Sequence, residues 1–204
     1  GDVYKRQLLA FLISSPSIAD EGMWLPHLLK TLNENEMQIK GLKITAEDIY
    51  SVNESSLKDA IVALNGGSCT AEMISSEGLM LTNHHCVDNL LQTHSTVENN
   101  YLEDGFWAMS KSEELKNENL SATFLTSIED VTNLFKDSLS IELSEAERNK
   151  KISEISKKIV SDKTDSTSYS ARVRSFYGGN DFYLITYVTY KDVRLVGAPP
   201  FSIG

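Results

Sequence analysis

The sequence predicts a mainly β protein with added helices, in which short antiparallel strands form a barrel. Residues 67–86 contain two strand-forming segments on either side of a tight Ser-Glu-Gly turn. Residues 171–176, 182–190 and 193–196 are rich in Val, Ile, Tyr and Phe, and a Gly-Gly-Asn turn separates the first two. Several short strands with turn signals between them are typical of a β-barrel, and the helices are expected to decorate it.

The segments before the hairpin are predicted to be helices. Leucines recur at helical spacing at the start of residues 26–41, and Gly41 is suited to end this helix. Thr45 is expected to begin a short helix by capping it with its hydroxyl group. Residues 56–64 place their apolar side chains on one helical face, which predicts a third helix.

After the hairpin, the patterns alternate between polar and apolar segments. Residues 88–93 are predicted to be a helical turn or loop, and residues 99–105 a polar loop. Residues 122–128 alternate as a half-buried strand does. Ser-Glu-Ala-Glu at 144–147 is a capping box, and it predicts a charged helix that ends near Ser161.

The composition limits the classes of function. The chain has 204 residues, a formal net charge of −10 and 41% hydrophobic residues. This length suits one domain, or one domain and part of another, with a substantial core. The acidic balance without a basic stripe argues against a nucleic-acid partner, because Lys and Arg neutralise phosphates. Since no run of 18 apolar residues occurs, no transmembrane helix is predicted.

The first residues predict export. An apolar run in residues 8–19 ends in Ser-Ile-Ala and follows Lys5 and Arg6, which is the pattern of a signal peptide cut after Ala19. A buried N-terminal helix is the alternative, but Pro16 argues against it. We therefore expect residues 1–19 to be a non-native start plus a signal peptide. Residues 20–204 are expected to be the truncated N-terminal part of a larger domain.

The only two cysteines of the chain, Cys69 and Cys86, bracket the hairpin. In an exported chain this spacing predicts a disulfide that ties the start of the first strand to the end of the second. His85 directly precedes Cys86, so its ring would sit on a cross-linked platform. A general base needs such placement, because proton transfer is efficient only within hydrogen-bond reach.

A strand that runs into His-Cys, with the cysteine paired one hairpin earlier, resembles the histidine strand of chymotrypsin-like serine peptidases. Further motifs resemble one group of that clan, the bacterial serine dipeptidyl-peptidases of types seven and eleven. These motifs are Ala-Asp-Glu-Gly-Met-Trp at 19–24, Leu-Thr-Asn-His-His-Cys at 81–86, Gln-Thr-His-Ser at 92–95, Asp-Gly-Phe-Trp-Ala-Met at 104–109 and Lys-Asp-Val-Arg-Leu-Val-Gly-Ala-Pro-Pro at 191–200.

The resemblance implies the incomplete first barrel of a trypsin-like double barrel. It assigns His85 as the general base of a Ser-His-Asp triad whose serine and aspartate lie beyond residue 204. The implied substrates are oligopeptides with a free N-terminus, the implied compartment is the Gram-negative periplasm, and the implied assembly is a homodimer. No cofactor and no metal are implied. The isolated chain is then expected to be inactive, because it supplies a base without its nucleophile.

Other readings of the histidines remain open. His84 competes with His85 for the role of base. Adjacent strand residues point to opposite faces, so at most one of the two is expected to face the cleft. The resemblance assigns the base to the residue next to Cys86 and leaves His84 as a hydrogen-bonded packing residue. A metal site that uses these residues is disfavoured, because zinc ligands rarely come from three consecutive positions. His94 is expected to cap a loop rather than line the cleft.

Two further segments have structural interpretations that we prefer. The large apolar residues of 104–109 are expected to pack in the core, with a substrate wall as the alternative. Asp192 lies close to Lys191 and Arg194, so a surface ion pair is favoured over a triad aspartate.

A different class of function is also compatible with the sequence: a secreted, non-catalytic binding domain on a trypsin-like barrel. It is suggested by the absence of a Gly-x-Ser-Gly-Gly serine from the 204 residues. If the chain is part of a peptidase, the resembled family includes members that prefer a hydrophobic residue and members that prefer an acidic residue before the cleaved bond. No residue of this chain distinguishes these two preferences.

Overall fold

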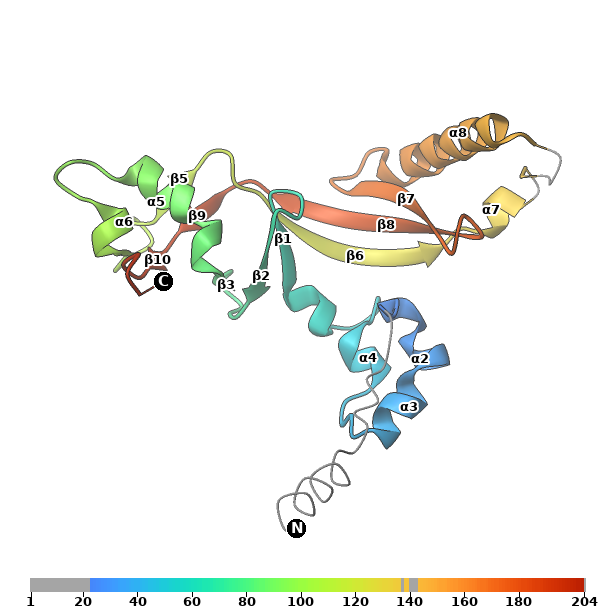
Figure 1. Cartoon of the computed structure of the whole chain (residues 1–204), viewed down its shortest axis with the longest axis horizontal. Coiled ribbons are helices and arrows are strands. Elements are labelled where there is room, and N and C mark those ends of the chain that lie inside the picture. Colours follow the sequence, from blue (N-terminus) through green and yellow to red (C-terminus); the bar gives the residue numbers. More distant parts are fainter. Residues whose placement is uncertain (1–22, 137, 140–142, 204) are drawn as a thin grey trace, which may run out of the picture.

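The structure is a computed structural model that describes residues 23–136, 138–139 and 143–203. A six-stranded sheet lies at its centre, with short helices toward the N-terminal side and a long helix along one arm (Figure 1). Two small two-stranded sheets and two helices form the opposite arm. All strand pairs are antiparallel, which confirms the prediction of a mainly β protein with added helices.

The central sheet is open. Its order is β3-β2-β1-β6-β8-β7, so β3 and β7 are opposite edges, and the described strands do not close the predicted barrel. On β6, the β1 partner covers only residues 122–124, whereas β8 pairs as far as Asp130. Its strands are β1 (Ile61–Leu64), β2 (Cys69–Met73), β3 (Met80–Thr82), β6 (Ala122–Asp130), β7 (Ser170–Phe176) and β8 (Asp181–Tyr190).

The two small sheets join the middle of the chain to its C-terminal part. Strand β4 (Phe106–Trp107) pairs with β10 (Gly197–Ala198), and β5 (Leu115–Asn117) pairs with β9 (Val193–Leu195). A small core forms beneath them from buried Leu91, Leu195 and Ala198. These sheets therefore bring residues 197–201 against a part of the chain that lies about ninety positions earlier.

Two glycines allow this close approach. Gly105 has φ +80°, and a Cβ there would lie 2.9 Å from the Ala198 carbonyl oxygen and from Pro200. A Cβ at Gly197 would lie 2.4 Å from the Trp107 ring. Real Cβ atoms do not approach other atoms so closely, so the β4–β10 pair requires glycine at both positions.

The N-terminal helix is broken where the sequence predicts a continuous one. Residues 26–41 form η1 (Pro26–Leu28), α2 (Leu29–Leu32) and α3 (Glu34–Ile39). The break occurs at Asn33, whose backbone is not helical at φ −125°. The next helix, α4 (Ala46–Ile49), is capped by Thr45 as predicted, because the Thr45 hydroxyl accepts from the Asp48 N–H at 3.1 Å.

Two other predictions about helices were wrong. Residues 56–64 form only one turn, η2 (Leu57–Ala60), before the chain enters β1. The polar residues 99–105 contain α6 (Tyr101–Asp104) instead of a loop. Strand β1 is hydrogen-bonded on both sides, to β2 and β6, and these distant partners override the local helical spacing.

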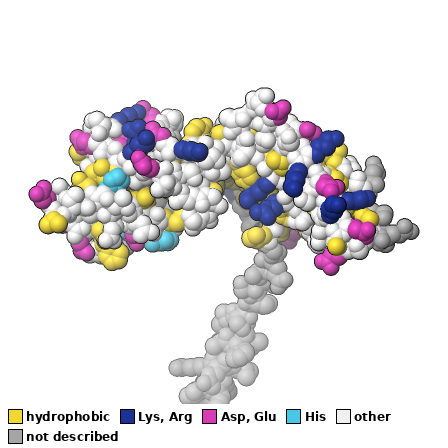
Figure 2. All heavy atoms as spheres, turned by 90° about the horizontal axis from the view of Figure 1, so that it is seen from above, with side chains coloured by type: hydrophobic (Ala, Val, Ile, Leu, Met, Phe, Trp, Pro, Cys, Tyr) yellow, Lys and Arg dark blue, Asp and Glu magenta, His cyan; other side chains and the backbone are white. Residues whose placement is uncertain are grey.

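The arm with the long helix agrees closely with the predictions made from the sequence. Helix α8 (Glu145–Thr164) begins at the Ser144 capping box, and β7 and β8 form the predicted hairpin. In its core, the rings of Phe135 in α7 (Asn133–Lys136) and Phe182 in β8 stack at 4.0 Å, and both side chains are buried. On the face shown in Figure 2, Lys and Arg side chains gather over this arm.

The main core of the sheet lies on the β1–β2 side. It is built from buried apolar residues of β1, β2, β9 and the segment that leads into β6, namely Val62, Leu64, Ala71, Leu120, Ala122 and Val193. Within the described part of the chain, no helix is long and apolar enough to span a membrane. The predicted signal peptide at 8–19, its cleavage point and the start of the predicted mature domain lie outside the described residues.

Candidate active site

The predicted hairpin ends in a single helical turn that carries both adjacent histidines. Strands β2 and β3 pair, with Ala71 opposite Thr82. The chain then leaves β3 through Asn83 and forms the 3₁₀ turn η3 (His84–Cys86). Two backbone hydrogen bonds close it, from the Cys86 N–H to the Asn83 carbonyl at 3.0 Å and from the Val87 N–H to the His84 carbonyl at 2.9 Å.

This turn corrects one step of the sequence argument. His84 and His85 were expected to alternate across a strand, but they lie on a 3₁₀ turn, where successive side chains point about 120° apart. The two rings still have different surroundings: His84 is half-buried and His85 is exposed.

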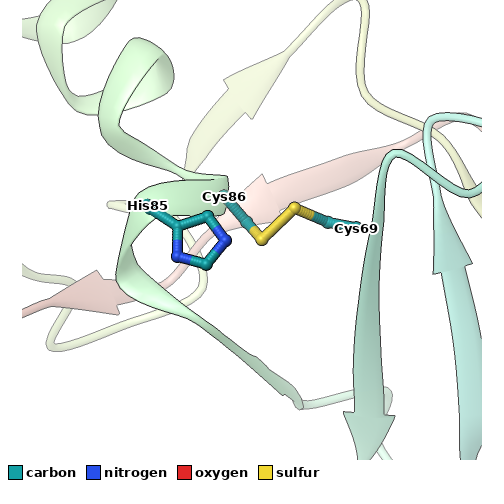
Figure 3. A group of neighbouring side chains, drawn as sticks. All are labelled: Cys69, His85 and Cys86. Atoms are coloured by element: carbon teal, nitrogen blue, oxygen red, sulfur yellow. A yellow bond between two sulfur atoms is a disulfide. The ribbon is translucent and has the colours of Figure 1, made fainter.

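The structure contains the predicted disulfide between Cys69 and Cys86. Their Cα atoms lie 6.2 Å apart, and the bond joins the start of β2 to the end of η3 (Figure 3). The closed loop holds the whole hairpin, so the position of η3 is fixed by the covalent link as well as by strand pairing.

The ring of His85 lies beside this disulfide and faces solvent (Figure 3). Its side-chain nitrogen and the two sulfur atoms lie within 4.8 Å of one another. Among the residues that the structure describes, no hydrogen bond or ion pair engages the ring. A neutral His85 therefore has a lone pair free to accept a proton, which is the first requirement of a general base.

In His84 both ring nitrogens lie against oxygen atoms. Its Nε2 donates to the carbonyl oxygen of Pro199 at 3.1 Å, and its Nδ1 lies 2.8 Å from an Asp88 carboxylate oxygen. Its ring also meets the edge of Phe201, with the ring centroids 6.0 Å apart. Because both nitrogens face acceptors, His84 could act as a base only by giving up one of these contacts.

The arrangement is unsuited to a metal ion in this state. Cys69, His85 and Cys86 form a cluster with the size of a three-ligand site. Metals bind cysteine as the thiolate, and here the two sulfur atoms are joined to each other. The donor chemistry of the cluster is therefore that of a cystine and one imidazole.

A large groove opens beside the hairpin. Its volume is about 1540 Å³, and its walls come from the central sheet and from the arm of the two small sheets, including Met73, Met80, Trp107 and Pro199. His84 also lines it, but His85 does not. Core packing was expected for residues 104–109, and it holds for half-buried Phe106 only: the Trp107 side chain is 66% exposed and forms part of the groove.

The two remaining candidates have structural roles. His94 ends α5 (Asp88–His94), and its Nε2 donates to the buried Asn117 side-chain oxygen at 3.0 Å. Asp192 accepts two hydrogen bonds from Arg194, at 3.0 and 2.9 Å, which confirms the predicted ion pair. The Arg194 guanidinium lowers the pKa of the Asp192 carboxyl group.

Sequence reasoning missed two groups at the site. Asp88 lies four residues after His84, a spacing at which side chains meet on helical structure, so this contact had a readable signal. The Pro199 carbonyl had none, because 115 positions separate it from His84.

Comparison with known proteins places the chain in a family. The sequence profile of the family Peptidase S46 matches residues 19–204, and the chain therefore belongs to that family. The recognition of the dipeptidyl-peptidase group from the motifs is confirmed.

Two relatives show how much of such a protein is present. The Asp/Glu-specific dipeptidyl-peptidase of Flavobacterium psychrophilum is 49% identical over 98% of the chain, and dipeptidyl-peptidase 7 of Capnocytophaga gingivalis is 44% identical over 98%. The chain spans only 28% and 29% of the lengths of these proteins.

Solved structures agree with the fold. The crystal structure of Porphyromonas endodontalis DPP11 is 42% identical in sequence and superposes with a TM-score of 0.75. The match covers 91% of this chain and 27% of the DPP11 chain. The same protein in complex with the dipeptide Arg-Glu gives 41% identity and a TM-score of 0.73 over 91% of this chain and 28% of the other.

Proposed function

We propose that the chain is part of a serine-type dipeptidyl-peptidase, with His85 as its general base. The observation that carries this proposal is the state of His85: exposed, free of partners among the described residues, and held beside a disulfide on a closed turn. The relatives are named as dipeptidyl-peptidases, which supports peptides with a free N-terminus as the substrates.

The mechanism follows from what a free imidazole can do. His85 accepts the proton of a serine hydroxyl as that oxygen attacks the scissile carbonyl, and it then returns a proton to the leaving amine. The serine and the aspartate that orients the imidazole come from elsewhere in the complete protein. In this proposal the open sheet is one part of a trypsin-like first barrel, and acyl transfer of this kind needs no cofactor.

The disulfide also supports a compartment. Disulfides persist in oxidising environments such as the periplasm, whereas cytosolic thiols stay reduced. Together with the signal-peptide pattern at 8–19, this supports export of the protein to the periplasm. We further propose that the complete enzyme is a homodimer, which sedimentation of the purified protein would test.

The experiment uses the complete gene product that contains residues 1–204. Dipeptide release is measured from chromogenic dipeptides with Asp, Glu or a hydrophobic residue before the cleaved bond. Matched substrates with a blocked N-terminus and the isolated 204-residue chain are the controls, and neither is expected to give product. Equal cleavage of blocked substrates, or activity that a serine-reactive fluorophosphonate leaves intact, would contradict the proposal.

A further inference from the structure

We propose that His84 is a positioning residue, which clamps η3 against the segment after β10 and thereby sets the direction of His85. The catalytic part of this inference rests on the proposed function. The mechanical part, that His84 holds η3 in place, stands on the contacts of the described residues alone.

The first contact ties η3 to a fixed acceptor. The Nε2–H of His84 donates to the Pro199 carbonyl at 3.1 Å. That carbonyl follows β10, where Ala198 pairs with Phe106 of β4, and it precedes Phe201, whose N–H donates to the Leu102 carbonyl at 3.0 Å. Because the backbone on both sides of the Pro199 carbonyl is held by hydrogen bonds, this acceptor has a fixed position. Its hydrogen bond to His84 therefore restrains η3.

The second contact ties η3 to the helix that follows it. The Nδ1 of His84 lies 2.8 Å from Asp88 Oδ1, and the His84 side chain is only 11% exposed. That carboxylate oxygen is buried, and no aligned hydrogen bond reaches it from any described residue. The two groups are in contact without an aligned hydrogen bond, so Asp88 restrains the ring by close packing at the start of α5.

The position of His85 between two anchors gives these contacts their effect. Cys86, on one side, is fixed by the disulfide, and His84, on the other, is fixed by Pro199 and Asp88. A single 3₁₀ turn is weak by itself, since its hydrogen-bond geometry is poor. Without the His84 contacts, η3 would be free to pivot about Cys86 and to carry the His85 ring with it.

The test compares three variants of the complete gene product. His84→Phe keeps a ring against Phe201 but loses both polar contacts, and His84→Gln keeps a side-chain donor for the Pro199 carbonyl. His94→Phe is the matched control, because it loses a histidine hydrogen bond of similar length, 3.0 Å, at the far end of α5.

Hydrogen exchange at the amides of Cys86 and Val87 reports the opening of η3. In His84→Phe we expect exchange to rise roughly tenfold, as loss of one or two hydrogen bonds would give. Exchange in His84→Gln and His94→Phe should stay near the wild-type rate. Unchanged exchange in His84→Phe would overturn the proposal.

Kinetics report the direction of His85. With active sites titrated by a fluorophosphonate, His84→Phe should lower kcat at least tenfold at unchanged KM, and His84→Gln should restore most of it. Faster exchange with normal kcat would overturn the positioning role, because η3 would then open without consequence. If the wild-type protein releases no dipeptide, the proposed function fails, and the exchange rates alone support or overturn the clamp.

Discussion

The hairpin region at residues 61–95 and the arm built from α7, α8, β7 and β8 are held together by different means. The hairpin has strands of three to five residues and depends on a disulfide and on the side-chain contacts of His84. The arm pairs β8, ten residues long, with neighbours on both sides and buries stacked aromatic rings. His85, the proposed base, therefore lies in the region with less strand pairing, where a disulfide and side-chain contacts replace a longer strand ladder.

Loss of His85 should have the largest effect on activity and little on either region. His85→Ala removes the proposed base, so kcat/KM of the complete gene product should fall by a factor of about a thousand or more, as loss of a triad member does. Because the side chain is exposed and unpartnered among the described residues, the melting temperature should stay within about 1 °C. Chromogenic dipeptide hydrolysis and calorimetry measure the two effects, and a milder loss than in His84→Phe would reverse the assignment of the base.

The arm should respond most to its aromatic core. Phe182→Ala removes the ring that stacks on Phe135 at 4.0 Å and should destabilise the arm by about 3–5 kcal/mol. Exchange of the β8 amides measures this loss, while the amides of η3 serve as the control. Equal acceleration in both regions would show that they unfold as one unit and would break the comparison.

The hairpin should respond most to its covalent link. Replacement of both Cys69 and Cys86 by serine removes a cross-link between positions that are 17 apart in the sequence, and it should cost about 3 kcal/mol on the chain-entropy model. Exchange should rise at the Cys86 position and across β2, and remain unchanged in β8. Protection of η3 that survives the double substitution would mean that the His84 contacts suffice without the disulfide.

A smaller effect is expected at the start of α8. The Ser144 hydroxyl accepts from the Glu147 N–H, and the Glu147 carboxylate accepts from the Ser144 N–H at 3.0 Å. Ser144→Ala should cost about 1 kcal/mol, confined to the first turn of the helix. Exchange of the first α8 amides checks this, and Ser144→Asp, which can still cap, should behave as the wild type does.

The smallest effect should appear on acidification at His27. Burial lowers the pKa of His27, although the Asp130 carboxylate partly opposes this shift. Above about pH 6.5, the ordinary histidine pKa, His27 is neutral in both the folded and unfolded states. Below about pH 6.5 the unfolded chain binds more protons than the folded chain. The free energy of unfolding should therefore decrease as the pH is lowered, until the folded-state pKa of His27 is reached.

The His27 ring packs against Tyr183 and near Tyr50, where the N-terminal helices meet the sheet. Exchange of the α4 amides, measured from pH 7 down to about pH 5.5, reads out the docking of those helices. In His27→Phe this part of the pH dependence should disappear. If it persists, another group titrates at this contact.

Local chemistry accounts for what the sequence predicted correctly. Patterns among neighbouring residues were enough to predict the helix caps at Thr45 and Ser144, the hairpin of β2 and β3, and the apolar strands β6 and β8. Strand β1 was missed because its two partners lie elsewhere in the chain, and its spacing also suits a helix. A barrel, incomplete in this chain, was predicted from short strands with turn signals, and the described strands form an open sheet instead. Local strand signals do not say which strands pair or whether they close.

The same distinction holds within the site. The disulfide followed from residues close together in the sequence, whereas the separation of His84 and His85 was expected from a strand and arises from a 3₁₀ turn. The contact to Pro199 did not follow from nearby residues, because it depends on the pairing of β4 with β10. The surroundings of the two histidines were thus predicted in part. The contact between His84 and Pro199 could be found only from the fold.

The close approach at Gly105 and Gly197 carries a consequence for the tolerance of this protein to random mutation. Neither residue has a side chain to take part in chemistry, yet a methyl group at Gly105 would meet the backbone of residues 198–200, next to the Pro199 carbonyl, and one at Gly197 would displace the Trp107 ring. A library screened only for surviving activity would therefore mark these glycines as strongly as His85. The two classes would separate when each inactive clone is also scored for correctly folded yield: the histidine variants should accumulate normally, and the glycine variants should not.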